Sequence, residues 1–176
     1  MKIKTVHLVG AIEFLENPDS GWRYELSKEL ESQFAIVSIN PVTVSFLVGK
    51  DIVENMKYAE KLKREWRLVE LNNFINDKIW PINAKSVDDA DVIITVARTA
   101  DELKHLSNSG GTIRELSRAV DQQTKPAFLV CECNDLTAAN THFLGLFLKR
   151  GSIFRSNDEL FKFLALNKKL PEKINF

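Results

Sequence analysis

Two hydrophobic periods alternate along this chain. Short runs that are apolar on both faces predict buried strands, and apolar residues three or four positions apart predict amphipathic helices. The expected strands are Val6–Ala11, Ala35–Ile39, Asp91–Ala97, Pro126–Cys133 and Ser152–Phe154. The expected helices are Trp22–Phe34, Asp51–Val69, Thr112–Gln123 and Asp158–Leu166. Residues 71–84 show no hydrophobic period by which they can be assigned to a helix or a strand. Residues 99–110 form a long connection that we expect to act as a lid.

Strands that alternate with helices predict an α/β fold, in which a parallel sheet is covered by helices on both faces. The length of 176 residues suits one domain. We therefore expect a single domain over residues 1–176, a doubly wound, flavodoxin- or Rossmann-like parallel sheet of about five strands in the order 2-1-3-4-5. Such sheets bind ligands at the carboxyl ends of their strands. Candidate chemistry is therefore expected after Gly10, Ala97 and Cys133.

The charge balance narrows the class of partner. The chain has 24 Lys and Arg against 24 Asp and Glu, so its formal net charge is zero. This balance argues against a nucleic-acid binder that relies on neutralising phosphates. No apolar run approaches the roughly 20 residues of a membrane span, and the N-terminus offers no signal-peptide cleavage site. We expect a soluble cytoplasmic protein that binds neither nucleic acid nor membrane.

The cysteines give no sign of a metal site. Cys131 and Cys133 are the only two in the chain, and no other Cys or His pair has zinc spacing. Alternation in a strand would point both thiols to the same side, where this spacing makes a poor disulfide. The prediction is two reduced, buried cysteines, with no metal and no cofactor.

The stretch from Ser109 to Glu115 is the most informative for chemistry. Gly110 and Gly111 allow a sharp turn and a close approach of the backbone to a ligand, and the helix that follows directs its free N–H groups there. Glu115 lies in the first turn, where the helix dipole favours an ionised carboxylate that could attack an anomeric carbon. The alternative is a capping box, in which Thr112 and Glu115 satisfy each other's backbone. The glycines and the position after the central strand favour the functional interpretation.

A second group of candidates follows the first strand. Gly10, Ala11 and Ile12 end that strand, and Asn40 precedes a proline after the second one. Trp22 and Arg23 begin the first helix, where they either pack and cap or reach a phosphate or carboxylate at the strand ends.

Taken together and in this order, these segments resemble the nucleoside 2-deoxyribosyltransferase-like family over residues 5–132. The segments are Leu8-Val9-Gly10-Ala11-Ile12, Trp22-Arg23, Asn40-Pro41, Val87-Asp88-Asp89-Ala90-Asp91-Val92-Ile93, Gly111-Thr112-Ile113-Arg114-Glu115 and Lys125-Pro126. The resemblance implies that Glu115 attacks the anomeric carbon of a deoxyribose. It also implies that residues 10–12 form one wall of a nucleoside pocket and that Gly111 and Thr112 lie beside the sugar or its 5′ group. Members of this family are generally homo-oligomers that complete their sites across interfaces, and some hydrolyse deoxynucleoside monophosphates instead of transferring the sugar.

Two departures from the family pattern concern the acid that contacts and protonates the base. The family has an aspartate near the position of Asn83, and another just before the Gly-Thr turn, where this chain has Asn108 and Ser109. Asp91 or Asp88 is the candidate substitute, although Asp91 could instead cap the start of its strand. His105, in the expected lid, is a further candidate acid.

The sequence therefore predicts cleavage or transfer at the N-glycosidic bond of a (deoxy)nucleoside or nucleotide. The alternatives are a non-catalytic sensor of a nucleotide-derived ligand and an oligomerising scaffold. The expected catalytic residues are Glu115 and Asp91. The expected substrate-binding residues are Gly10, Ala11, Ile12, Trp22, Arg23, Asn40, Asn83, Asp88, Gly111 and Thr112. The expected partners are a small-molecule nucleoside or nucleotide and further copies of the chain.

Overall fold

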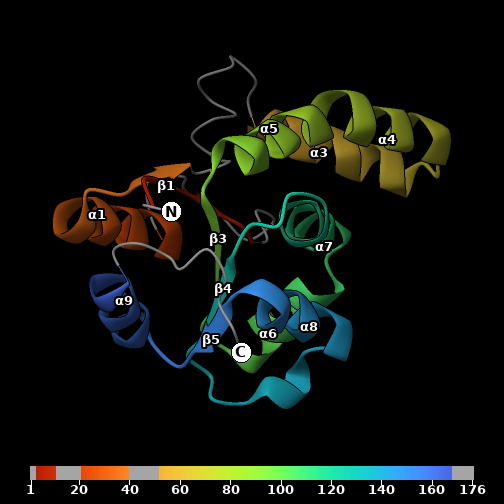
Figure 1. Cartoon of the computed structure of the whole chain (residues 1–176). Coiled ribbons are helices and arrows are strands. Elements are labelled where there is room, and N and C mark those ends of the chain that lie inside the picture. The colour runs from red at the N-terminus through yellow and green to blue at the C-terminus, as the bar shows by residue number, and fades with distance from the viewer. Residues whose placement is uncertain (1–2, 11–20, 40–51, 168–176) are drawn as a thin grey trace.

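A five-stranded, all-parallel sheet forms the centre of the protein (Figure 1). The computed structural model describes residues 3–10, 21–39 and 52–167. The strands lie in the order β2-β1-β3-β4-β5, as the sequence predicted. Their bounds are β1 Thr5–Leu8, β2 Val37–Ile39, β3 Val92–Ala97, β4 Ala127–Cys131 and β5 Ser152–Phe154. The chain therefore has an α/β, Rossmann-like fold with its topological switch between β1 and β3.

The central strands are buried on both faces because helices cover the sheet on both sides. All six residues of β3 and all five of β4 are buried. Their apolar, largely β-branched composition suits a strand with no solvent face. The register places His7 of β1 beside Ile93 of β3, and Ile93 beside Ala127 of β4. The strands thus hold their carboxyl ends along one edge.

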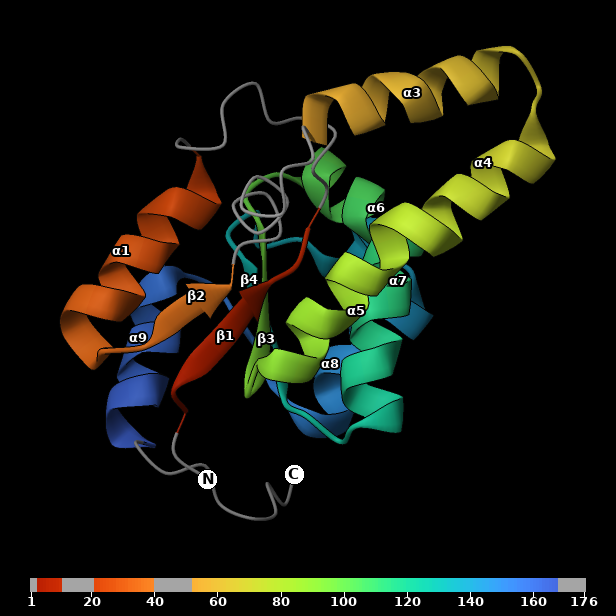
Figure 2. The same ribbon diagram turned by 90° about the horizontal axis from the view of Figure 1, so that it is seen from above.

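Two apolar clusters, one on each face of the sheet, make up the core. Figure 2 shows the helices that cover the two faces. On one face, α1 (Trp22–Phe34) and α9 (Asn157–Leu166) bury Leu26, Leu30 and Leu160 against the sheet. On the other face lie α6 (Ala100–Asn108), α7 (Gly110–Ser117) and α8 (Thr141–Arg150). Strand alternation assigns Val6 and Leu8 of β1 to the α1 face, and Val9 to the α7 face.

The helix expected over Asp51–Val69 is wrong as a single element. The chain forms α3 (Ile52–Arg64), turns back at Trp66, and begins α4 (Leu68–Phe74) two residues later. Trp66 adopts φ 55°, a left-handed conformation that ends a right-handed helix. The resulting hairpin projects from the body of the protein in Figure 2. An apolar stripe that runs through a turn looks continuous in the sequence, which is why the break was missed.

The segment 71–84, which the sequence left unplaced, is helical throughout. It comprises α4, a π-helical turn η1 (Ile75–Ile79) and α5 (Trp80–Asp89). Pro81 lies two residues after the π turn. Proline cannot donate the usual backbone hydrogen bond to the preceding turn, and a π turn is one way for a helix to accommodate this loss.

Further boundaries differ from expectation. The expected lid over 99–110 is mostly the regular helix α6, whose Leu103 and Leu106 are buried in the core. Helix α7 begins at Gly110, and its continuation ends in a second π turn, η2 (Arg118–Gln122). Helix α8 occupies a region with no sequence assignment, after the short 3-10 turn η3 (Leu136–Ala138). Within the described part of the chain, no helix has both the length and the apolar character needed to cross a membrane.

Candidate functional site

The side chain of Glu115 lies inside the protein on the inner face of α7. It is 6% exposed, although a carboxylate is rarely buried unless it has partners. The hydroxyl of Ser109, not Thr112, caps the helix by accepting from Thr112 N at 3.5 Å. The carboxylate of Glu115 turns to α5 and β1 instead. The capping-box alternative is therefore wrong, and this carboxylate is held by tertiary contacts.

Two side chains from other elements contact the Glu115 carboxylate. Asn83 Nδ2, on α5, donates to Oε1 at 2.5 Å. His7 Nε2, on β1, lies 3.5 Å from Oε2, a contact that falls short of a hydrogen bond. His7 Nδ1 lies 3.2 Å from the carbonyl oxygen of Ile39 at the end of β2. That carbonyl can only accept, so Nδ1 carries hydrogen and Nε2 is the ring atom that faces the carboxylate.

A buried guanidinium lies at the end of β1. Arg23, in the first turn of α1, is 1% exposed, and its Nε donates to the carbonyl oxygen of Leu8 at 3.2 Å. Among the described residues, its two terminal nitrogens have no hydrogen-bond partner. Burial lowers the pKa of Arg23 to about 10, while the charge of Glu115 acts in the opposite direction. Arg23 is therefore still a cation at neutral pH, and it offsets part of the cost of burying the Glu115 carboxylate.

Gly10 and Trp22 complete the surroundings of Arg23. The Arg23 Cζ lies 4.6 Å from the centre of the Trp22 ring, within the range of a cation–π contact. A Cβ atom at Gly10 would lie 2.8 Å from Arg23 Nη2 and 3.1 Å from Trp22 Cζ2. A side chain at position 10 would therefore require the Arg23 guanidinium to shift. Three of the expected substrate-binding residues thus contact one another.

The start of α7 provides accessible backbone near Glu115. Gly110 and Gly111 are exposed and lie in the first turn of the helix, not in a preceding loop as the sequence suggested. No described atom would come within 4 Å of a Cβ at Gly110, and Ser109 Oγ would lie 4.0 Å from one at Gly111. Packing therefore does not require either glycine. Thr112 is buried one turn before Glu115.

The structure does not bring Asp91 to Glu115. One Asp91 oxygen accepts from the backbone N of Lys4 at 2.7 Å, from the backbone N of Thr5 at 3.0 Å and from Thr5 Oγ1 at 3.2 Å. These donors lie at the amino edge of the sheet, where β1 and β3 begin. The structure therefore does not support a catalytic role for Asp91, and its carboxylate caps the start of the strands.

Asp88 likewise has a structural partner. Its two oxygens accept from Arg118 Nε and Nη2, each at 2.7 Å, and Gln123 donates to the same carboxylate. The hydrogen bond from Arg118 is the main reason that the pKa of Asp88 is lowered. This pair ties the end of α5 to η2. It lies five residues beyond Asn83, toward the amino edge, and does not contact the Glu115 carboxylate.

Three expected site residues, Ala11, Ile12 and Asn40, lie outside the described residues. His105, the other candidate acid, is half-buried on α6. The described residues contain no group of three or more His, Cys, Asp or Glu side chains arranged to hold a metal ion.

His7 is the site residue that sequence reasoning did not select. A signal for it was present, because His7 is a polar residue in an otherwise apolar strand. Glu115 similarly interrupts the apolar stripe of its helix. Two polar positions on buried faces of neighbouring elements are expected to be partners, since neither is stable there alone.

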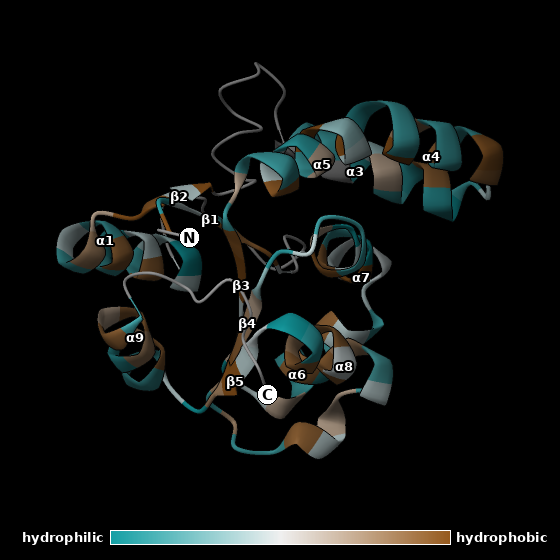
Figure 3. Cartoon of the chain, in the orientation of Figure 1, coloured by the Kyte–Doolittle hydropathy of each residue, from teal (hydrophilic) through white to brown (hydrophobic). Residues whose placement is uncertain are grey.

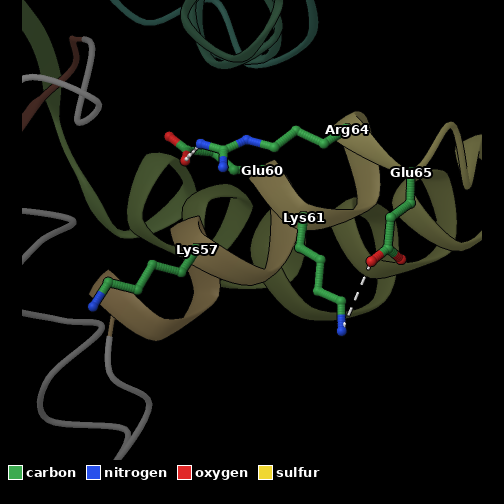
Figure 4. A pocket seen from close by; sticks show the side chains of 5 residues that line it. All are labelled: Lys57, Glu60, Lys61, Arg64 and Glu65. Carbon is green, nitrogen blue, oxygen red and sulfur yellow. Dashed lines mark hydrogen bonds and ion pairs between the residues drawn. The ribbon is translucent and has the colours of Figure 1, made fainter.

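Two hollows in the described surface lie away from Glu115. One, on the outer side of α3, is lined by five charged side chains, including the pairs Glu60–Arg64 and Lys61–Glu65 (Figure 4). Another lies between α1 and α9, beside Phe34 and Phe161. The first is an array of i, i+4 ion pairs on a solvated helix, which is ordinary surface structure.

No protein-family model and no curated protein matches this chain.

Proposed function

We propose that this protein cleaves or transfers at the N-glycosidic bond of a (deoxy)nucleoside or nucleotide, with Glu115 as the nucleophile. The observation that carries the proposal is the placement of the Glu115 carboxylate. It is buried, held by Asn83 and faced by His7, beside a helix start with accessible glycine backbone. A buried carboxylate that one neighbouring element holds by a hydrogen bond and another contacts is preorganised for attack, whereas a surface carboxylate is not.

The proposed reaction has two steps at the anomeric carbon. One Glu115 oxygen forms an ester bond to that carbon while the carbon–nitrogen bond breaks and its electron pair leaves with the base. A second base, or water, then attacks the same carbon and releases Glu115. The departing base takes its proton from water. Asn83 and His7 serve as positioning residues, because they contact the nucleophile and not the reacting carbon.

A specific observation favours a second candidate, a non-catalytic binding protein for a nucleotide-derived ligand. In the family that the sequence resembles, an aspartate near position 83 protonates the base, but Asn83 is an amide and donates to Glu115. Asp88 and Asp91, the expected substitutes, are engaged in structural contacts. The contacts of Asn83, Asp88 and Asp91 therefore fit a site that binds a nucleotide-derived ligand but does not protonate its base.

A base-release assay separates the two candidates. The full-length protein is incubated with deoxynucleosides and with deoxynucleoside monophosphates, with and without a free acceptor base, and released or exchanged base is measured. The enzyme predicts release that Glu115→Gln lowers by roughly 10³-fold or more, as expected for loss of a nucleophile. The binding protein predicts thermal stabilisation by these compounds, without turnover, that Glu115→Gln retains. Neither turnover nor stabilisation would refute both candidates.

A further inference from the structure

The two cysteine thiols lie closer together than alternation along a strand would place them. Cys131 is the last residue of β4, and Cys133 lies in the turn that follows. Their Sγ atoms are 3.2 Å apart, and both are free thiols. This distance is short enough that a modest side-chain movement would reach bonding geometry.

The turn after β4 explains why the thiols meet. The backbone N of Glu132 still donates to Ala97 O at 2.9 Å, so the chain follows β3 up to that residue. It then turns sharply, with Asn134 at φ 54°. The side chain of Cys133 therefore folds back beside Cys131, where its thiol donates to Asp135 O at 3.6 Å.

We propose that Cys131 and Cys133 form a redox-active dithiol, which closes to an intramolecular disulfide by exchange with a small-molecule disulfide such as oxidised glutathione. The Cys133 thiolate attacks one glutathione sulfur, forming a mixed disulfide and releasing one glutathione thiolate. The Cys131 thiol then loses its proton to water and attacks the Cys133 sulfur, displacing the second glutathione. The protein thus gives up two electrons and two protons, and one glutathione disulfide is reduced to two thiols.

Burial decides the order of the two cysteines. Cys133 is half-buried, whereas Cys131 is almost fully buried. Burial raises the pKa of Cys131 to about 11, and its hydrogen bond with Cys133 acts in the same direction. Cys131 is therefore a poor first nucleophile. Once Cys133 carries glutathione, however, the neighbouring sulfur is the nearest electrophile to Cys131, and proximity offsets its low reactivity.

The ring closed by this disulfide would contain only one intervening residue. Cross-linking so short a loop removes little freedom from the unfolded chain, so it adds little stability. Strained or exposed disulfides are also the more readily reduced ones. We therefore expect the oxidation to be reversible by reduced glutathione. This inference is independent of the proposed function of Glu115.

The test uses the full-length protein in defined mixtures of reduced and oxidised glutathione. Remaining thiols are blocked with iodoacetamide, and the intact mass is measured. The expected product is a monomer, lighter by two hydrogens, that resists alkylation at both cysteines and regains both thiols in excess reduced glutathione. A lasting glutathione adduct on Cys133 while Cys131 still alkylates, or disulfide-linked dimers as the main product, would overturn the proposal.

The single variants Cys131→Ser and Cys133→Ser are matched controls that remove one thiol each. Cys131→Ser should accumulate the glutathione adduct on Cys133. Cys133→Ser should leave a thiol that alkylates at least about tenfold more slowly than the thiol remaining in Cys131→Ser, because reactivity follows the thiolate fraction and access. Equal alkylation rates would contradict the assigned order. Circular dichroism of each variant verifies that these rates are measured on folded protein.

Discussion

At the scale of single residues, the hydrogen bond between Asn83 and Glu115 is the feature of the candidate site that is most sensitive to substitution. The amide of Asn83 satisfies one oxygen of the buried Glu115 carboxylate, since it donates a hydrogen bond and adds no charge. An aspartate at the same position would place two carboxylates within hydrogen-bond distance. Two such groups cannot both ionise without strong repulsion, so one of them would keep a proton.

Asn83→Asp should therefore make stability fall as pH rises. The folded protein would hold a proton with a raised pKa, while the unfolded chain would release it near the usual carboxyl pKa. The free energy of unfolding of the variant then falls as the pH rises above the usual carboxyl pKa. The total loss is about 1.4 kcal/mol for each unit by which folding raises that pKa. Urea unfolding measured from pH 5 to pH 8, compared with the unsubstituted chain, tests this.

Asn76→Asp is the matched control, because Asn76 lies in the π turn before α5 and its Oδ1 accepts from Arg114 Nη1 at 3.0 Å. A carboxylate there faces a cation, so its stability effect should not grow as pH rises. Equal pH profiles for Asn83→Asp and Asn76→Asp would contradict the placement of Asn83.

Residue types singled out Glu115 but predicted neither its place in the helix nor its partners. Helix α7 begins at Gly110, so Glu115 lies in the second turn and not, as expected, in the first. The glycines and the helix that follows them identified the segment, while the partners depend on how α5 and β1 pack against α7. Asp88 and Asp91 are the instructive errors. Their spacing in the sequence suggested a second acid, but the fold directs both carboxylates toward donors at the amino end of the sheet.

At the scale of elements, the sequence predicted the sheet better than the helices. Strands β3 and β4 were the most recognisable, because a run that is buried on both faces has few alternatives in a chain of this composition. Figure 3 shows apolar residues concentrated in the strands and on the inward sides of the helices. The α3–α4 hairpin was missed because Trp66 looks in the sequence like one more member of the apolar stripe. In the structure it lies in the turn after α3 and is 81% exposed.

The backbone just before β5 lies very close to the backbone of β4 at the edge of the sheet. A Cβ atom at Gly151, just before β5, would lie 1.6 Å from the carbonyl oxygen of Ala127 in β4. A backbone atom cannot move aside as a flexible side chain can, so any side chain at this position must push β4 and β5 apart.

Gly151→Ala should accordingly destabilise the protein by about 1–3 kcal/mol or more, as expected for overpacking in a core. Gly145→Ala is the control, because Gly145 is exposed within α8 and no described atom lies within 4 Å of a Cβ there. That substitution should stabilise by up to about 1 kcal/mol through helix propensity. Chemical denaturation of both variants tests the pair, and a Gly151→Ala variant as stable as Gly145→Ala would refute the close approach.

At the scale of the whole molecule, the candidate site takes charged side chains from both helical layers. Arg23 comes from α1 on one face of the sheet, and Glu115 comes from α7 on the other. Both side chains are buried, and the charge of Glu115 favours the protonated form of Arg23. Such a pair is stabilising only while both charges are present, since either one alone is left uncompensated.

A double-mutant cycle with Arg23→Met and Glu115→Gln tests this link. Each single variant should lose stability, and the double variant should lose less than the sum of the two by about 0.5–3 kcal/mol, the range measured for coupled residues. Urea unfolding of the four proteins provides the measurement. Strictly additive losses would show that the two charges do not interact across the sheet.

The most direct test of Glu115 as the nucleophile is to look for a sugar ester on this residue. The protein is mixed with a deoxynucleoside or deoxynucleoside monophosphate, quenched in acid during the first turnover, digested, and its peptides are weighed by mass spectrometry. We predict a deoxyribosyl or deoxyribosyl-phosphate adduct on the peptide containing Glu115, formed as base is released and absent from Glu115→Gln. Base release at an undiminished rate in Glu115→Gln, or an adduct on another residue, would contradict it.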